Sequence, residues 1–214
     1  MLMREPTDPA LRLAMASLSL PGLLIEHRLI SPGDEQALMA EEAQSLSSSR
    51  PEARRASGAA RIVARRLLAK LGHSGVALPR AGSGAPIWPE GVVGSLAHDC
   101  RVALAAVAAQ GEVIGLGVDV EPAEPLPADM LDLVATSRER ARLGGDTLRG
   151  RLLFVAKEAV YKALHPLDGI FLEHHDVEID FEARRATAPH ARVLELRWCV
   201  STRLVALAVL RRSP

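Results

Sequence analysis

The sequence predicts an α+β fold with two similar α/β lobes in a pseudo-twofold arrangement. Its 214 residues can bury one large core or two small lobes of about 100 residues each. A faint internal repeat favours two lobes: RVALAAV at 101–107 resembles RLVALAV at 203–209, and each follows a strand and a short polar turn. An amphipathic helix pattern precedes each copy, at 54–71 and at 148–164. Apolar strands often look alike, so on these patterns alone a true repeat and a chance likeness stay equally open.

The first half of the chain alternates apolar segments with turn signals. The stretch at 53–72 is apolar on one stripe, with arginines spread around it, and Gly72 is a suitable C-cap for a helix there. Gly and Pro are frequent over 73–92, which predicts a loop. The other predicted elements are a strand at 23–30, a helix at 35–50 stopped by a serine run and Pro51, and a hairpin at 92–98 and 101–108 that turns near Asp99.

The second half begins with a strand predicted over 111–122, followed by a proline-rich connection at 122–129. A proline ends a helical pattern in most contexts, so Pro166 is expected to end the longest helix. The remaining predicted elements are helices at 130–133, 137–143 and 148–165, and strands at 174–182, 191–200 and 203–212.

Composition excludes several classes of function. The 26 basic and 26 acidic residues cancel, so no overall field attracts a polyanion, and the 3% aromatic content leaves few platforms for stacking single-stranded nucleic acid. The apolar stretch at 11–25 is short and contains Arg12 and Pro21, so we expect neither a membrane span nor a signal peptide. Cys100 and Cys199 lack metal-ligand spacing, and we expect reduced thiols in a cytoplasmic, monomeric protein.

Two stretches carry the chemistry. In FVAKEAVYKAL at 154–164, Glu158 and Lys162 are i,i+4 neighbours on one helical face. In GVDVEP at 117–122, a strand period of two places Asp119 and Glu121 on one side. Three carboxylates would offer hard oxygen ligands suited to Mg²⁺, with Lys162 as a nearby proton donor. Each stretch alone is more often an ordinary surface ion pair or an exposed strand end.

Together the two stretches resemble the motifs of the 4′-phosphopantetheinyl transferase superfamily, G-[IV]-D-x-E and [WF]-x-x-K-E-[AS]-x-x-K. Both motifs occur intact, as GVDVE at 117–121 and FVAKEAVYK at 154–162. The resemblance to Sfp-type members implies two lobes, 1–113 and 114–214, with the active site in the cleft between them. In IWPEGVVGSLAH, residues 87–98, the chain is similar to the enterobactin-synthetase-associated subgroup.

The same resemblance implies that coenzyme A is bound by Arg54, Arg61, Ser95, His98 and Lys157. The bland alternatives are a solvated arginine face, a turn histidine with a local hydrogen bond, and a snorkelling surface lysine.

The chain departs from the family pattern at three places on the nucleotide side. Ala97 replaces a hydroxyl residue, ASGAAR at 56–61 is a degraded lead-in, and GSGAP at 82–86 lacks the basic residue usually found before the proline. Arg80 is the candidate to replace that missing charge.

The function implied is transfer of 4′-phosphopantetheine from coenzyme A to a serine of an apo acyl, peptidyl or aryl carrier protein, with release of 3′,5′-ADP. Mg²⁺ would be held by Asp119, Glu121 and Glu158. Glu158 would act as base, directly or through a water, and Lys162 would stabilise the leaving phosphate. The subgroup likeness favours siderophore or secondary-metabolite pathways.

Two alternatives remain. The first is a non-catalytic relative that binds coenzyme A or a carrier protein without transfer, which the degraded arginine and loop motifs would favour. The second is another Mg²⁺-dependent phosphoryl-transfer or hydrolytic enzyme, for which the sequence offers no Gly-rich phosphate loop.

Overall fold

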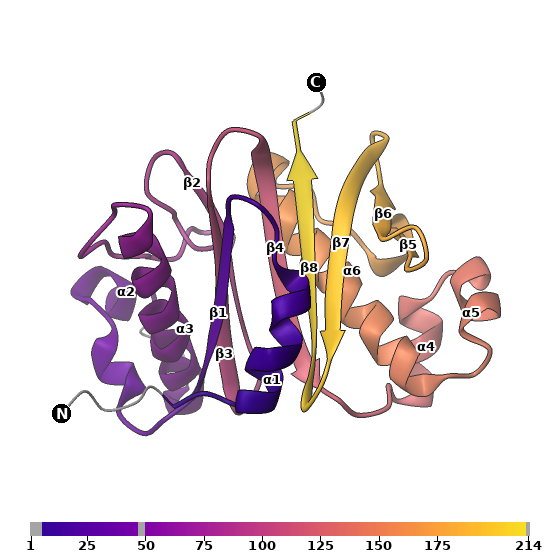
Figure 1. The fold of residues 1–214 in the computed structure, drawn as a ribbon, viewed down its shortest axis with the longest axis horizontal. Coiled ribbons are helices and arrows are strands. Elements are labelled where there is room, and N and C mark those ends of the chain that lie inside the picture. Colours follow the sequence, from indigo (N-terminus) through magenta and orange to yellow (C-terminus); the bar gives the residue numbers. More distant parts are fainter. Residues whose placement is uncertain (1–5, 47–49, 213–214) are drawn as a thin grey trace.

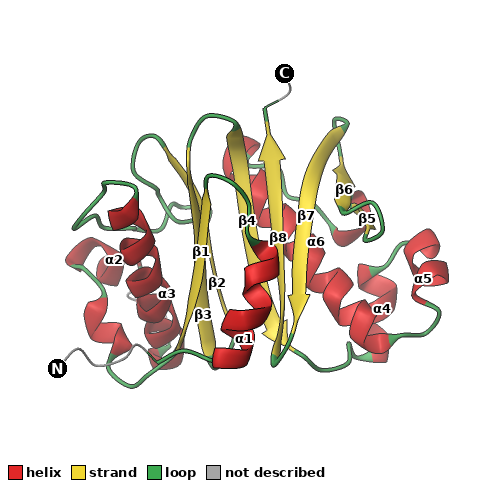
Figure 2. Cartoon of the chain, viewed as in Figure 1, coloured by secondary structure: helices red, strands yellow, loops and turns green. Residues whose placement is uncertain are grey.

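A computed structural model describes residues 6–46 and 50–212, and it arranges them as two antiparallel sheets flanked by helices (Figure 1). The first sheet has the order β1-β3-β2, formed by Leu23–Leu29, Val102–Ala109 and Val92–His98. The long helix α3, Pro51–Lys70, packs on this sheet. Figure 2 shows that α3 and α6 lie on opposite outer sides of the pair of sheets.

The second sheet contains five strands in the order β4-β8-β7-β6-β5. Its strands are Val113–Pro122, Arg203–Arg211, Arg192–Val200, Arg185–Ala188 and Glu178–Asp180. The helix α6, Thr147–Asp168, packs against β4 and β8. The shorter elements are α1 Pro9–Met15, η1 Ala16–Leu18, η2 Asp34–Ala37, α2 Ala40–Ser45, α4 Ala128–Val134, α5 Ser137–Leu143 and η3 His174–Asp176. Among the described residues, none of the helices is long and apolar enough to cross a membrane.

The two sheets repeat one arrangement. In β1-β3-β2 with α3, and in β4-β8-β7 with α6, a strand leads through a helix into a hairpin whose last strand lies in the middle. The two sequence segments that resemble each other, 101–107 and 203–209, lie mostly in β3 and β8, which are those middle strands. The predicted α+β fold with two similar halves is therefore confirmed.

An apolar layer between the sheets joins the two halves. Val118 and Val120 of β4 pack there with Leu104 of β3 and Leu207 of β8, and the helix α1 adds Leu11. The residues of β3 that alternate with Leu104 lie in a second cluster with α3. Because β3 is buried on both faces, its run of apolar residues is continuous rather than alternating.

The helix predicted over 35–50 is wrong in its extent. The chain forms the short η2 and α2 instead, because Leu38 and Met39 adopt extended backbone between them and Glu42 accepts a hydrogen bond from the Met39 N–H at 2.8 Å. The serine run at 47–49, which was expected to stop this helix, lies outside the described residues.

Pro166 does not end α6, which continues to Asp168. A proline in the last turn removes a single intrahelical hydrogen bond, and the Gly169 N–H still donates to His165 O at 2.8 Å. Gly169 ends the helix in the left-handed conformation (φ 69°), which glycine adopts without strain.

The strand predicted over 174–182 is also shorter than expected. Residues 174–176 form the 3₁₀ helix η3, whose Glu173 N–H donates to Asp176, and the strand β5 covers only Glu178–Asp180. The strand β6 and the helix α1, for which Asp8 is the N-cap, were not predicted from the sequence.

Candidate functional site

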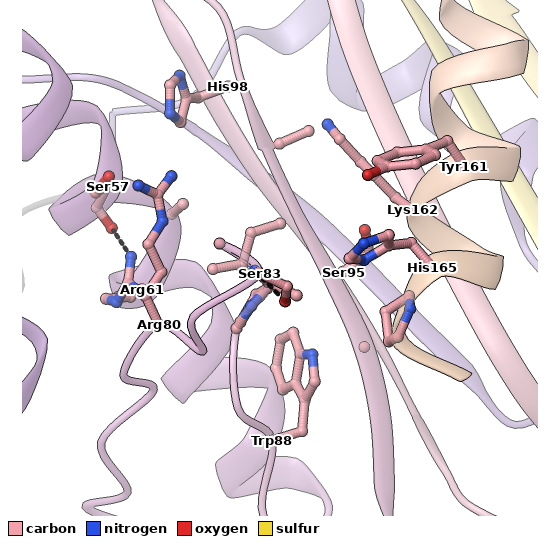
Figure 3. Close-up of a pocket in the computed structure, with 18 residues that line it drawn as sticks. Ser57, Arg61, Arg80, Ser83, Trp88, Ser95, His98, Tyr161, Lys162 and His165 are labelled. Carbon is pink, nitrogen blue, oxygen red and sulfur yellow. Dashed lines mark hydrogen bonds between the residues drawn. The ribbon is translucent and has the colours of Figure 1, made fainter. Parts of the chain in front are cut away.

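A cavity of about 420 Å³ lies between the two halves of the chain, within the size range of cofactor pockets. Figure 3 shows Tyr161, Lys162 and His165 projecting from α6 on one side of it. The opposite walls come from α3, the loop before β2, and β2 itself. The lining side chains from these walls include Ser57, Arg61, Arg80, Ser83, Trp88, Ser95 and His98.

The cavity is positively charged. Arg61, Arg80 and Lys162 line it, and among its described lining residues none is acidic. His98 is exposed at the cavity. Desolvation by the surrounding protein, followed by the charge of Lys162, lowers the pKa of His98 below the ordinary value of a histidine. Burial also lowers the pKa of Arg61, to which the charge of Arg80 contributes. The cations therefore repel one another, and a bound polyanion would relieve that repulsion.

Arg61 shapes the cavity as well as lining it. Its Nε donates to Leu78 O at 2.9 Å, and its Nη1 donates to Ser57 O at 3.3 Å. The fully buried Glu42 lies 3.6 Å from Arg61 and accepts a hydrogen bond from the Leu78 N–H at 2.8 Å. Arg61 and Glu42 thus hold both backbone polar groups of Leu78, which fixes the start of the loop that carries Arg80.

Arg80 lies in the cavity, where its charge acts on both Arg61 and His98. It has no ion-pair partner among the described residues, so its guanidinium is available to an anion.

Arg54 does not reach this cavity, contrary to the sequence prediction. Its Nη1 donates to Ala43 O and Leu46 O, at 3.2 and 2.9 Å, and so caps the end of α2. These carbonyl groups would otherwise be unsatisfied at the helix terminus, which explains why the arginine turns toward them.

Ser95 and His98 both lie on β2 beside the second sheet. The Ser95 side chain is buried, and its Oγ accepts a hydrogen bond from the Val118 N–H of β4 at 3.1 Å. Gly94 is required next to it, because a Cβ there would lie 2.7 Å from the ring of Trp88. Trp88 therefore packs flat against the strand and forms part of the cavity wall.

The acidic residues of β4 face α6, as the strand period predicted. Val118 and Val120 point into the apolar layer between the sheets, whereas Asp119 contacts Lys162 of α6. Close approach of the helix depends on Gly117, where a Cβ would lie 1.8 Å from Ala159 O. The glycine before Asp119 thus brings the strand carboxylates next to the helix that carries Glu158.

Each of the three acids has a cationic or imidazole partner. Asp119 Oδ1 accepts from Lys162 Nζ at 2.6 Å, Glu121 Oε2 lies 3.2 Å from Arg151 Nη1, and Glu158 Oε1 lies 3.0 Å from His174 Nε2. Burial raises the pKa of Asp119, Lys162 opposes the rise, and the charge of Glu158 adds to it. Partial burial and the charge of Asp119 likewise raise the pKa of Glu121.

These carboxylates fit a divalent cation by their chemistry. Within residues 6–46 and 50–212, no group of three or more His, Cys, Asp or Glu side chains is already arranged to hold a metal ion. The raised pKa of Asp119 nevertheless shows that Lys162 does not fully offset the cost of the buried negative charge. Hard oxygen atoms whose negative charge is not fully compensated are ligands that Mg²⁺ prefers in proteins.

Lys157, predicted to bind a phosphate, is not among the residues that line the cavity. Its Nζ donates to Glu139 Oε2 and His174 O, both at 2.7 Å, and to Val134 O at 2.9 Å. The residue is 2% exposed, so the alternative of a snorkelling surface lysine is wrong. All three ammonium protons are used in joining α6 to α5, to the end of α4 and to η3.

A second cavity of about 400 Å³ adjoins the first on the other side of Tyr161. Glu158 and His174 line it, together with the exposed apolar side chains Leu133 and Phe171. Tyr161 was expected at helical spacing with Glu158 and Lys162 but was given no role, and His165 was not predicted to belong to the site, although its spacing places it on the same helical face. Trp88 was noted in the sequence only as part of the stretch at 87–98, without a role of its own.

Comparison with known proteins identifies relatives for both halves of this chain. A family model described as the 4′-phosphopantetheinyl transferase N-terminal domain matches residues 41–108, and one described as the 4′-phosphopantetheinyl transferase superfamily matches residues 115–209. The 4′-phosphopantetheinyl transferase Svp of Streptomyces mobaraensis is 34% identical over 211 residues, which cover 88% of this chain and 85% of Svp.

Two further relatives have similar names. The 4′-phosphopantetheinyl transferase Npt of Nocardia iowensis is 41% identical over 73% of this chain and 72% of its own. The 4′-phosphopantetheinyl transferase PptT of Mycobacterium tuberculosis is 37% identical over 57% of this chain and 56% of its own. Among solved structures, the Thermotoga maritima holo-[acyl-carrier-protein] synthase (AcpS) aligns with a TM-score of 0.39 and 21% identity, over 47% of this chain and 65% of that one.

Proposed function

The chain belongs to the 4′-phosphopantetheinyl transferase superfamily, and we propose that its two adjoining cavities separate the two substrates of that reaction. The enzyme transfers the 4′-phosphopantetheine group of coenzyme A to a serine of a carrier protein. The observation that carries the division of the cavities is that Tyr161 lines both of them, with Lys162 on one side and Glu158 on the other. We retain residues 1–113 and 114–214 as the proposed lobes, and a monomer as the proposed state.

The positively charged cavity is the proposed site for the nucleotide end of coenzyme A. Arg80 and Lys162 present charged groups to it, and guanidinium pairs well with phosphate. Arg61 and His98 supply further donors, while Ser95 forms part of the wall. The contacts already described for Arg54 and Lys157 support a structural role for those two residues instead.

Asp119, Glu121 and Glu158 are the proposed holders of Mg²⁺. They are hard oxygen ligands, and the pKa of Asp119 is raised by burial and by the charge of Glu158, while that of Glu121 is raised by burial and by the charge of Asp119. When bound there, the metal ion would supply positive charge to the pyrophosphate oxygens. Lys162 donates a hydrogen bond to Asp119 and also lines the nucleotide cavity. Binding of the metal ion by Asp119 would release Lys162 to face that cavity.

The reaction forms a bond between the carrier serine oxygen and the β-phosphorus of coenzyme A. It breaks the bond from that phosphorus to the oxygen of the 3′,5′-ADP leaving group. Glu158 is the proposed acceptor of the serine proton, and Lys162 the proposed donor of charge or a proton to the leaving phosphate. Their positions one helical turn apart suit these opposite roles, because attack and departure take place on opposite sides of the phosphorus.

The carrier protein is proposed to approach from the second cavity. Leu133 and Phe171 are 68% and 73% exposed at its edge, and such apolar surface is typical of interaction sites. This approach would bring the carrier serine to Glu158 without crossing the nucleotide cavity. The siderophore or secondary-metabolite setting remains a proposal, as do the cytoplasmic location and the enterobactin-synthetase-associated subgroup.

Mass spectrometry of an apo carrier domain tests the function directly. Incubation with the enzyme, coenzyme A and Mg²⁺ should add one phosphopantetheine group and release 3′,5′-ADP only when the carrier is present. Glu158→Ala should fold normally and abolish transfer. Metal-independent binding of coenzyme A without any transfer would instead identify a non-catalytic binding protein, and transfer by Glu158→Ala at the parental rate would remove Glu158 from the mechanism.

A further inference from the structure

His174 is a side chain of the site that the sequence analysis and the proposed mechanism leave unused. It begins η3, beyond the end of α6, and its Nε2 lies 3.0 Å from Oε1 of Glu158. Among the described residues, the contact with Glu158 is the hydrogen bond that the His174 ring makes.

The position of His174 is fixed from two directions. Its backbone carbonyl accepts a hydrogen bond from Lys157 Nζ at 2.7 Å, and Lys157 is itself anchored by the buried Glu139. Its ring packs against Phe154, one turn before Glu158 on α6, with centroids 5.4 Å apart. The adjacent His175 is exposed, and none of these contacts involves it.

The geometry also defines the role of each nitrogen and oxygen atom. An ionised carboxylate only accepts hydrogen bonds, so the proton of this contact is on Nε2 of His174. Oε1 of Glu158 accepts from His174 and keeps a second acceptor site for the proposed metal ion, whereas Oε2 has no hydrogen-bond partner among the described residues. One of the two carboxylate oxygens is held in place and the other is available.

We propose that His174 is a positioning residue, which orients the Glu158 carboxylate so that Oε2 faces the incoming serine hydroxyl of the carrier protein. The inference rests on the proposed function, in which Glu158 accepts the serine proton. The buried pair Lys157–Glu139 then also supports the position of His174, because Lys157 donates a hydrogen bond to the His174 carbonyl. A side chain that orients a catalytic group is expected to affect the rate of transfer more than the binding of coenzyme A.

A matched pair of substitutions tests the proposal. His174→Gln and His174→Met introduce unbranched side chains of similar size, but only glutamine retains an N–H donor. We expect His174→Gln to remain within about threefold of the parental kcat, and His174→Met to lose about 10- to 100-fold, with the KM for coenzyme A unchanged in both. His174→Phe retains an aromatic contact with Phe154 but has no N–H donor, so its kcat should fall as much as that of His174→Met. His175→Met is the control for the same chemical change one residue away.

The remaining outcomes overturn the proposal. Equal losses in His174→Gln and His174→Met would show that packing rather than the donor matters, and thermal unfolding would reveal the lost stability. Parental kcat in His174→Met would remove the residue from the mechanism, as would a rise in the KM for coenzyme A at constant kcat. Absence of transfer by the unsubstituted enzyme would overturn the proposed function itself, and this inference with it.

Discussion

Lys162 Nζ lies 2.6 Å from Oδ1 of Asp119, so a cation from the long helix α6 contacts the most buried acid of the strand β4. Burial still raises the pKa of Asp119 despite this contact. The ionised carboxylate is therefore retained at a cost to folding, as is common for groups that serve a reaction.

Asp119→Asn should separate the cost of the carboxylate to folding stability from its contribution to transfer. At neutral pH without metal ions, the variant should be at least as stable as the parent, because a carboxyl pKa raised in the folded state destabilises that state once the group is ionised. Transfer should fall by at least about 10²-fold. Thermal unfolding with and without Mg²⁺ checks the first part, since Mg²⁺ should stabilise the parent only. Parental transfer by Asp119→Asn would contradict the metal assignment.

The nucleotide cavity distinguishes Arg80 from Arg54. Arg80→Ala should raise the KM for coenzyme A by about 10- to 100-fold, because a charge-assisted contact with phosphate is lost. Arg54→Ala should leave that KM unchanged and lower stability by about 1–2 kcal/mol, since two carbonyl groups of α2 lose their donor. Steady-state kinetics and urea unfolding of both variants give the comparison. The reverse pattern would place Arg54 at the nucleotide.

Gly117→Ala probes the packing of α6 on β4. The added Cβ would lie 1.8 Å from Ala159 O and 2.6 Å from Ala163 N, so the helix must move. Stability should fall by about 3 kcal/mol or more, and transfer should fall with it, because Glu158 moves relative to Asp119. Gly111→Ala is the control, since nothing lies within 4 Å of its added Cβ. Equal urea midpoints for the two variants would disprove the close contact.

Lys157 offers a test of structural against phosphate-binding roles. Lys157→Met leaves the Glu139 carboxylate buried without a cation, so stability should fall by about 3–5 kcal/mol. The same change at Lys70, whose side chain is 51% exposed in its pair with Glu26, should cost under about 1 kcal/mol. Chemical denaturation measures both. A stable Lys157→Met with a raised KM for coenzyme A would restore the phosphate role implied by the family motif.

The buried His27 predicts a loss of stability in mild acid. Burial lowers the pKa of His27 below its ordinary value of 6.5, and its Nε2 accepts a hydrogen bond from the Asp8 N–H. The unfolded chain therefore takes up the proton first, and stability present above pH 6.5 is lost as pH falls toward the folded pKa. The slope is at most about 1.4 kcal/mol per pH unit. His27→Gln should flatten the pH dependence of the free energy of unfolding just below pH 6.5. An unchanged slope would show that another group causes the loss of stability.

Strand periodicity and helix spacing made much of the site predictable. Asp119 had to lie opposite Val118 because successive side chains of a strand alternate, and Glu158 and Lys162 had to share a face because they are four residues apart. Gly117 allows the strand and the helix to approach closely, because it has no side chain. The motif contains this glycine, but the sequence alone does not show why it is needed.

Long-range partners were less predictable. Arg54 and Lys157 were assigned to phosphate by family spacing, whereas their actual acceptors, Leu46 O and Glu139, come from segments whose positions only the tertiary structure fixes. His174 was unassigned because it has no companion ligands at zinc-site spacing in the sequence, and its contact with Glu158 depends on the tertiary structure. The prediction that Pro166 ends α6 was wrong, because a proline in the last turn of a helix removes only one hydrogen bond.

The hydrogen bond from the Val118 N–H to Ser95 Oγ, with the apolar layer beside it, has an evolutionary implication. Where the sheets meet, each half would expose apolar side chains if it were separated from the other. Recombination that exchanged one half for the corresponding piece of another transferase would have to import a matching set of side chains for this seam. Diversification within the family is thus expected to proceed through loops and cavity walls more readily than through shuffling of halves.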